Sequence, residues 1–180
     1  MSLIQVAPGH ELRTPLLVWI DDRPDNNAYE VAQARKMGIY VIEMTSTAMA
    51  KAWVDANLCK FIFPFYSPLT LNQIVLAFLR NNDFPSRLRF ISDNVRFETT
   101  PDAGTYLNPT AGESFLRYLR GRFFTAPVLI YTGEHRIAST SYVERYDAAG
   151  STTKRRVTMR YIANLAAGKD DDSNWKAFHW

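Results

Sequence analysis

Short, continuous apolar runs recur along the chain, and each ends at a polar or acidic residue. Runs of this length, without the alternation of a half-exposed strand, predict strands that are buried on both faces of a sheet. The predicted strands are Leu16–Ile20, Ile39–Met44, Leu88–Ile91, Pro127–Tyr131 and a brief segment, Ser151–Thr153.

Segments with helical spacing of apolar residues, or with capping and stop signals, lie between these runs. The predicted helices cover residues 26–37, 47–57, 113–120 and 157–167, and a short helix is predicted to end at Ala149–Gly150. Residues 94–112 are rich in turn formers and predict a long loop. Strands that alternate with helices predict an α/β fold, a three-layer sandwich around a central five-stranded parallel sheet.

The chain is predicted to hold one folded domain, residues 15–168, between a flexible N-terminal segment, 1–14, and a C-terminal tail, 169–180. Residues 58–85 are aromatic and interrupted by prolines. We interpret this stretch as an insertion between the second helix and the strand that precedes Asp93. A retained intron in the gene is the alternative, and the sequence alone leaves it open.

Composition narrows the class of protein. The chain has 180 residues, of which 47% are hydrophobic, enough for one buried core. The net charge is +3, and the basic residues are scattered apart from Lys154–Arg156, so we expect no nucleic-acid partner. A single cysteine, Cys59, precludes an intramolecular disulfide and fits a reducing compartment. No signal peptide or membrane span is evident, so a cytoplasmic protein without membrane association is expected.

Polar side chains that are capable of binding ligands or taking part in catalysis follow four of the predicted strands: Asp21–Asp22, Asp93, Thr132 and Lys154. Right-handed crossovers place the carboxyl ends of parallel strands at one edge of the sheet, where ligands bind in such folds. Converging carboxylates repel one another, and a hard cation such as Mg²⁺ relieves that repulsion. A carboxylate beside the cation can attack a phosphoryl group, while the metal and a lysine neutralise its oxygens. The acidic pair could instead end a strand and cap the next helix.

These segments together resemble the receiver domain of response regulators. Val18–Asp22 is similar to the first strand and acidic pair, and Phe90–Asp93 to the strand that carries the phospho-acceptor. Asn108–Gly112 is similar to the loop before the third helix, Val128–Gly133 to the fourth strand with its switch hydroxyl, and Ala148–Lys154 to the approach to the family's lysine. The resemblance spans roughly residues 15–167 and implies a flavodoxin-like fold.

The resemblance also implies roles for individual residues. Asp21, Asp22, Asp93 and the backbone carbonyl of Val95 would bind Mg²⁺. Asp93 would receive the phosphoryl group from a histidine kinase or a phosphotransfer protein, and Thr132 and Lys154 would read the phosphorylated state. Enzyme activity would be limited to self-phosphorylation and dephosphorylation, and homodimerisation is a further option.

Two positions depart from the receiver pattern. Arg155 stands where receivers usually have proline, and Thr152 stands where an aromatic switch residue is expected. An alternative function is therefore a pseudo-receiver that acts as an interaction module without phosphorylation. A small hydrolase is a third reading, although the sequence has no nucleophile elbow and no glycine-rich phosphate loop.

Overall fold

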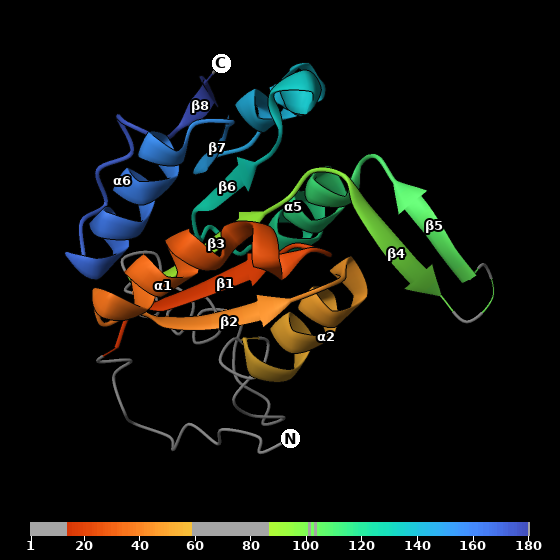
Figure 1. Cartoon of the computed structure of the whole chain (residues 1–180), viewed down its shortest axis with the longest axis horizontal. Coiled ribbons are helices and arrows are strands. Elements are labelled where there is room, and N and C mark those ends of the chain that lie inside the picture. The colour runs from red at the N-terminus through yellow and green to blue at the C-terminus, as the bar shows by residue number, and fades with distance from the viewer. Residues whose placement is uncertain (1–13, 59–86, 101, 103, 180) are drawn as a thin grey trace, which may run out of the picture.

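A parallel sheet of six strands runs through the centre of the molecule (Figure 1). The computed structural model describes residues 14–58, 87–100, 102 and 104–179. The strands of this sheet are β1 (Leu16–Ile20), β2 (Tyr40–Met44), β3 (Leu88–Ser92), β6 (Val128–Tyr131), β7 (Ala149–Thr152) and β8 (Ala177–His179). They lie in the order β2-β1-β3-β6-β7-β8. The first five reproduce the flavodoxin-like order, so the predicted parallel sheet is confirmed, with one strand added at the β7 edge.

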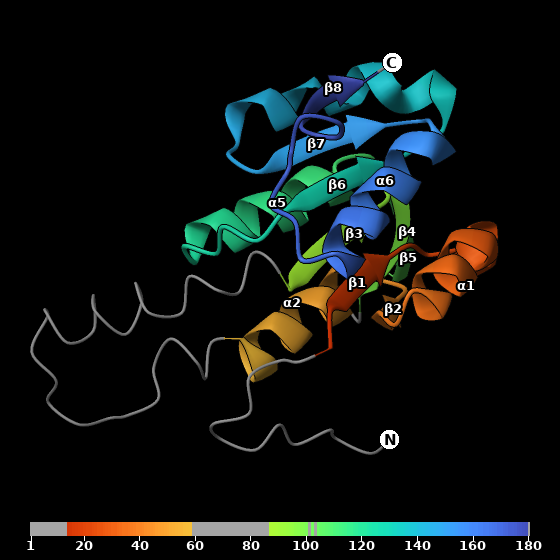
Figure 2. The ribbon, with the colours of Figure 1, turned by 90° about the vertical axis from the view of Figure 1, so that its left-hand side faces the viewer.

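Helices cover both faces of the sheet and complete the predicted three layers (Figure 2). One face carries α1 (Ala28–Lys36), which follows the short 3-10 helix η1 (Pro24–Asn27), and α6 (Arg155–Ala166). The other face carries α2 (Thr47–Asn57), α5 (Ala111–Gly121) and the 3-10 helix η2 (Glu134–Arg145).

Alternate residues of the central strands supply two separate cores. Val18, Ile20 and Phe90 pack toward α2 and α5, and Leu17 and Trp19 pack toward α1 and α6. Side chains on successive strand residues point to opposite faces, so a strand between two helical layers must be apolar throughout. This requirement explains the continuous apolar runs in the sequence.

A β-hairpin replaces the long loop predicted after Asp93. Strands β4 (Arg96–Thr100) and β5 (Gly104–Asn108) pair in antiparallel register and project from the body of the molecule (Figure 1). The segment alternates buried Arg96 and Glu98 with exposed Phe97 and Thr99. The buried positions are charged, so the alternation of buried and exposed residues in this strand does not appear as an alternation of apolar and polar residues. The pattern of apolar residues therefore does not predict the strand.

The C-terminal tail contributes strand β8, which pairs with β7. Trp175, just before this strand, is 1% exposed and packs edge-on against Tyr161, with the ring centroids 4.9 Å apart. The predicted helix end at Ala149–Gly150 is wrong, because η2 ends at Arg145 and these residues begin β7, in register with β6. The pairing of β7 with β6 outweighs the local signal of Ala149 and Gly150, from which the end of a helix was predicted.

Two predicted segments lie outside the described residues: the N-terminal segment, apart from Thr14, and the insertion at 58–85, apart from Leu58. Leu58 follows the last residue of α2, where that helix was predicted to end. None of the helices in the described part of the chain is both long enough and apolar enough to cross a membrane.

Candidate functional site

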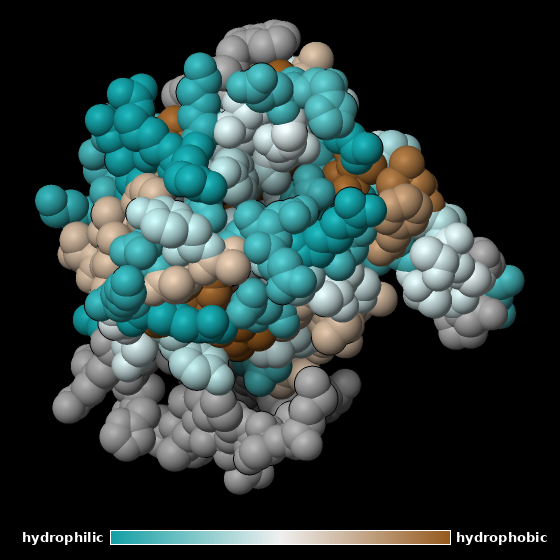
Figure 3. All heavy atoms as spheres, in the orientation of Figure 1, coloured by the Kyte–Doolittle hydropathy of each residue, from teal (hydrophilic) through white to brown (hydrophobic). Residues whose placement is uncertain are grey.

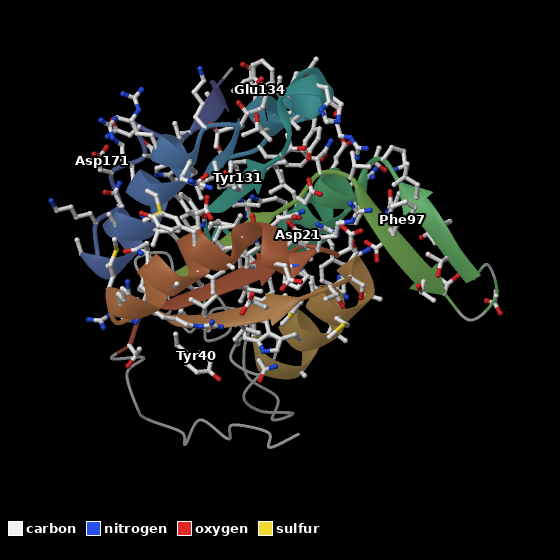
Figure 4. The ribbon with its side chains drawn as sticks, in the orientation of Figure 1. Asp21, Tyr40, Phe97, Tyr131, Glu134 and Asp171 are labelled. Atoms are coloured by element: carbon white, nitrogen blue, oxygen red, sulfur yellow. The ribbon has the colours of Figure 1, made fainter. Side chains whose placement is uncertain are left out.

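Three carboxylates meet where the central strands end. Figure 4 labels one of them, Asp21. Asp21 and Asp22 follow β1, and Asp93 follows β3. The two strands are neighbours in register, and the backbone N–H of Asp93 donates to the carbonyl of Ile20 at 2.9 Å. One carboxylate oxygen from each aspartate lies within 4.8 Å of the others. The structure thus brings together the acidic residues that the sequence placed at two strand ends.

Hydrogen bonds fix the orientation of each carboxylate. Asp21 accepts the backbone N–H of Arg23 at 2.7 Å and the side-chain amide of Asn27 at 2.6 Å. The N–H of Phe97, in the hairpin, donates to Asp22 at 3.1 Å. Asp93 accepts the N–H of the following residue at 2.6 Å. A carboxylate has about four acceptor sites, so each retains capacity for a further ligand.

The site disfavours the accumulation of negative charge. Burial raises the pKa of Asp93 to about 6, and the nearby charge of Asp21 adds to that effect. Burial also raises the pKa of Asp21, with Asp22 contributing. Two buried carboxyl groups whose ionisation is disfavoured, beside a third carboxylate, fit a hard divalent cation such as Mg²⁺.

An open cavity of about 300 Å³ lies beside the carboxylates. Thr132, which follows β6, lines it, as do Val95 and all three aspartates. The Thr132 side chain is buried, and its hydroxyl has no hydrogen-bond partner in the described part of the chain. A buried polar atom without a partner is costly, and Thr132 belongs to the lining of a space large enough for a polar ligand. Five of the six predicted site residues therefore line one cavity.

Lys154 is the predicted site residue that does not line this cavity. It precedes α6, its side chain is exposed, and its backbone N–H donates to the hydroxyl of Thr152 at 3.0 Å. The next residue, Arg155, reaches toward α1 and pairs with buried Glu30 at 2.7 Å. The role predicted for Lys154 stays a prediction.

Arg96 is a site-supporting residue that the sequence analysis missed. It is fully buried, and its guanidinium donates to the carbonyl oxygens of Asp93 at 2.6 Å and Ile20 at 3.3 Å. It also pairs with Glu98 at 3.4 Å, and Glu98 accepts the N–H of Thr47 at the start of α2. Arg96 therefore ties the ends of β1 and β3 to each other and to the hairpin. No local signal marks a charged strand residue as buried.

Asn94 connects the site to η2. Its side-chain amide donates to the hydroxyl of Ser139 at 2.8 Å, and its oxygen accepts the hydroxyl of Tyr142 at 2.7 Å. Gly112, at the start of α5, lies close beside this pair, and a Cβ there would lie 2.9 Å from the Tyr142 hydroxyl oxygen. The close packing explains why a glycine stands in the first turn of α5.

Comparison with known proteins gives a likeness in structure only. No family model matches the chain, and no curated protein matches its sequence. The signal receiver domain of a LuxO repressor-type protein from Vibrio parahaemolyticus matches with a TM-score of 0.50 and 9% identity, covering 86% of this chain and 92% of that one. The signal receiver domain of a NarL-type response regulator from Mycobacterium tuberculosis matches with a TM-score of 0.46 and 14% identity, covering 87% and 98%. At such low identity the likeness concerns the fold.

Proposed function

We propose that this chain, which has the fold of response-regulator receiver domains, is a signalling domain that accepts a phosphoryl group on Asp93. Asp21 and Asp22 would hold Mg²⁺, together with Asp93 and the backbone carbonyl of Val95. The observation that carries the proposal is the meeting of three carboxylates within 4.8 Å, beside a cavity lined by Thr132, whose buried hydroxyl has no partner among the described residues.

The chemistry follows from the arrangement of these side chains. An ionised oxygen of Asp93 attacks the phosphorus of the donor, a P–O bond to aspartate forms, and the bond from phosphorus to the donor breaks. The electron pair of that bond leaves with the donor, which is the imidazole nitrogen of a phosphohistidine in a kinase or phosphotransfer protein. Bound Mg²⁺ would neutralise the charge on the phosphoryl oxygens. The Thr132 hydroxyl would donate to one of those oxygens and so gain the partner that it lacks.

Protonation decides whether Asp93 can act as the nucleophile. With a pKa raised to about 6, Asp93 is mostly ionised at neutral pH and loses its charge below pH 6. Asp21 shares the burial and accepts two hydrogen bonds, which hold its carboxylate in place for the cation. The two groups thus have different tasks in the same cluster.

Acetyl phosphate provides a direct test, because it donates a phosphoryl group without a partner protein. We expect the wild-type chain to gain one phosphoryl group in the presence of Mg²⁺, measured by intact mass, and to lose the reaction in EDTA. Asp93→Asn should abolish it. Asp25→Asn, which alters an exposed carboxylate of η1 outside the cluster, is the matched control and should react as the wild type does. Label that persists on Asp93→Asn contradicts the proposal.

A second candidate function is an interaction module that works without phosphorylation. The hairpin favours it, because Phe97 and Leu107 face each other across β4 and β5 and each is 47% exposed. Figure 3 shows apolar atoms gathered where the hairpin leaves the body. This function predicts that neither Mg²⁺ in the millimolar range nor acetyl phosphate changes the protein, measured by thermal denaturation and intact mass.

A further inference from the structure

We propose that Arg136, rather than Lys154, supplies the positive charge that faces a phosphoryl group in the cavity. The inference rests on the phosphoryl-accepting role of Asp93 proposed above. It assigns to Arg136, in η2, the task that the sequence resemblance gives to Lys154, the residue before α6.

The position of Arg136 is fixed relative to Asp93. Arg136 lines the cavity together with Asp93 and Thr132. Its carbonyl accepts the hydroxyl of Ser139 at 2.7 Å, and the same hydroxyl accepts the side-chain amide of Asn94 at 2.8 Å. One serine hydroxyl thus links the backbone of Arg136 to the residue that follows Asp93. At its other end, the N–H of Arg136 donates to the carbonyl of Gly133 at 3.0 Å.

The side chain of Arg136 is available for an anion. Its Nε donates to the imidazole of His135 at 3.2 Å, and no carboxylate pairs with it among the residues that the structure describes. The terminal nitrogens of a guanidinium form paired, charge-assisted hydrogen bonds with phosphoryl oxygens. An anion in this cavity would therefore meet an arginine on one side.

Thr132 gives independent evidence for a ligand at the same place. Its side chain is 8% exposed, its hydroxyl has no partner within the described residues, and it lines the cavity four positions before Arg136. Thr132 and Arg136 line the same cavity as a cluster of carboxylates that fits a cation, so the cavity offers groups for an anion and for a cation. A phosphoryl group together with a divalent cation matches both.

Arg155, the residue next to Lys154, is held at α1. Arg155 pairs with Glu30 of α1 at 2.7 Å, and Glu30 also accepts the hydroxyl of Tyr131 at 3.4 Å. These contacts anchor the first turn of α6 to α1, on the opposite face of the sheet from η2. Lys154 itself is exposed and does not line the cavity.

Rates of labelling by acetyl phosphate with Mg²⁺ test the assignment in the full chain. We expect Arg136→Ala to slow labelling by about ten-fold or more, the size of effect for one charge-assisted hydrogen bond. Arg136→Lys should recover part of the rate, and Lys154→Ala should stay within about two-fold of the wild type, well under one such bond. Arg136→Ala should leave stabilisation by Mg²⁺ unchanged, because the side chain faces the phosphoryl group and not the cation.

The outcomes separate the two proposals. A wild-type chain that is labelled, with Lys154→Ala slow and Arg136→Ala unaffected, overturns the assignment of Arg136 and leaves Asp93 as the acceptor. Slow labelling of Arg136→Ala combined with lost Mg²⁺ stabilisation also overturns it, since the residue would then support the fold of the site. A wild-type chain that is never labelled removes the proposed function and this inference with it.

Discussion

The side-chain oxygen of Asn94 accepts a 2.7 Å hydrogen bond from the buried hydroxyl of Tyr142. Asn94 directly follows Asp93, and Tyr142 lies in η2. The hydrogen bond therefore joins the residue next to Asp93 to η2. Burial strongly raises the pKa of Tyr142, so its hydroxyl keeps its proton and acts as a donor. Any shift of the backbone at Asp93 would reach η2 through this contact.

Removal of the Tyr142 hydroxyl should destabilise the protein without disturbing the carboxylates. Tyr142→Phe leaves the Asn94 oxygen buried without this donor, which we expect to lower the free energy of unfolding by about 1–2 kcal/mol. Urea denaturation measures the change. Tyr106→Phe, on the exposed hairpin, removes a hydroxyl that is in contact with solvent and should change stability little. Equal losses in the two variants would show that the Asn94 contact contributes nothing.

The raised pKa of Asp93 predicts how stability depends on pH. In the unfolded chain its pKa is near the ordinary 3.8, and in the fold it is about 6. Between these values the folded state binds the proton more tightly, so this contribution is full below pH 4 and is lost as pH rises through 6. Asp93→Asn removes the buried charge and still accepts the N–H of Asn94. We expect it to stabilise the metal-free protein on the order of 2 kcal/mol at pH 8.

The stability of Asp93→Asn must be compared with that of the wild type at several pH values, because the direction in which the difference changes with pH is the test. The difference in free energy of unfolding between Asp93→Asn and the wild type, measured by urea denaturation in EDTA, should shrink steadily from pH 8 to pH 4. Asp25→Asn, an exposed carboxylate of η1, should show no such trend. A difference that grows toward acid pH would mean that the Asp93 carboxylate is stabilised by the fold.

Loss of Arg96 should be far more damaging than loss of a surface arginine. Arg96→Met removes three hydrogen bonds that one guanidinium nitrogen makes to the strand ends, and it leaves Glu98 buried without its ion pair, so we expect a loss of about 3–5 kcal/mol. Arg35→Met breaks an exposed pair with Glu43 and should cost about 1 kcal/mol or less. Both are measured by denaturant unfolding.

A second substitution shows whether the buried charge explains the loss. Glu98→Gln in the Arg96→Met background removes the unpaired carboxylate, while its amide oxygen can still accept the N–H of Thr47. The double variant should regain part of the stability lost in Arg96→Met. If it is less stable than the single variant, the main role of Arg96 is to bond the carbonyls of Ile20 and Asp93.

Gly150→Ala tests the packing of the C-terminal segment on β7. A Cβ at this position would overlap the carbonyl oxygen of Trp175, so the backbone that leads into β8 would have to move. We expect the melting temperature to fall and Trp175 fluorescence to shift toward that of an exposed indole. Gly121→Ala is the control, because nothing lies within 4 Å of the added Cβ and alanine favours a helix. A variant at position 150 that melts like the wild type would contradict the packing of this segment.

The sequence by itself predicted five of the six strands of the sheet and the place of the acidic residues after two of them. Continuous apolar runs and right-handed crossovers are local or topological signals, and they placed Asp21, Asp22, Asp93, Thr132 and Lys154 at one edge, of which all but Lys154 line the cavity. The start of α2 is also marked locally, since the Ser46 hydroxyl accepts the N–H of Met49 at 3.1 Å. These features depend on residues close to one another in the chain.

Only the tertiary structure decided which side chains surround the carboxylates. Arg96 and Glu98 are charged residues whose burial follows from contacts with α2 and the ends of β1 and β3. Strand β8 has three residues and forms by pairing with β7. The hydrogen bond from Asn94 to Ser139 ties the turn that holds Arg136 to the residue after Asp93, and the ion pair of Arg155 with Glu30 ties the residue next to Lys154 to α1. Such long-range contacts leave no periodic pattern in the sequence, because each joins residues whose separation along the chain is arbitrary.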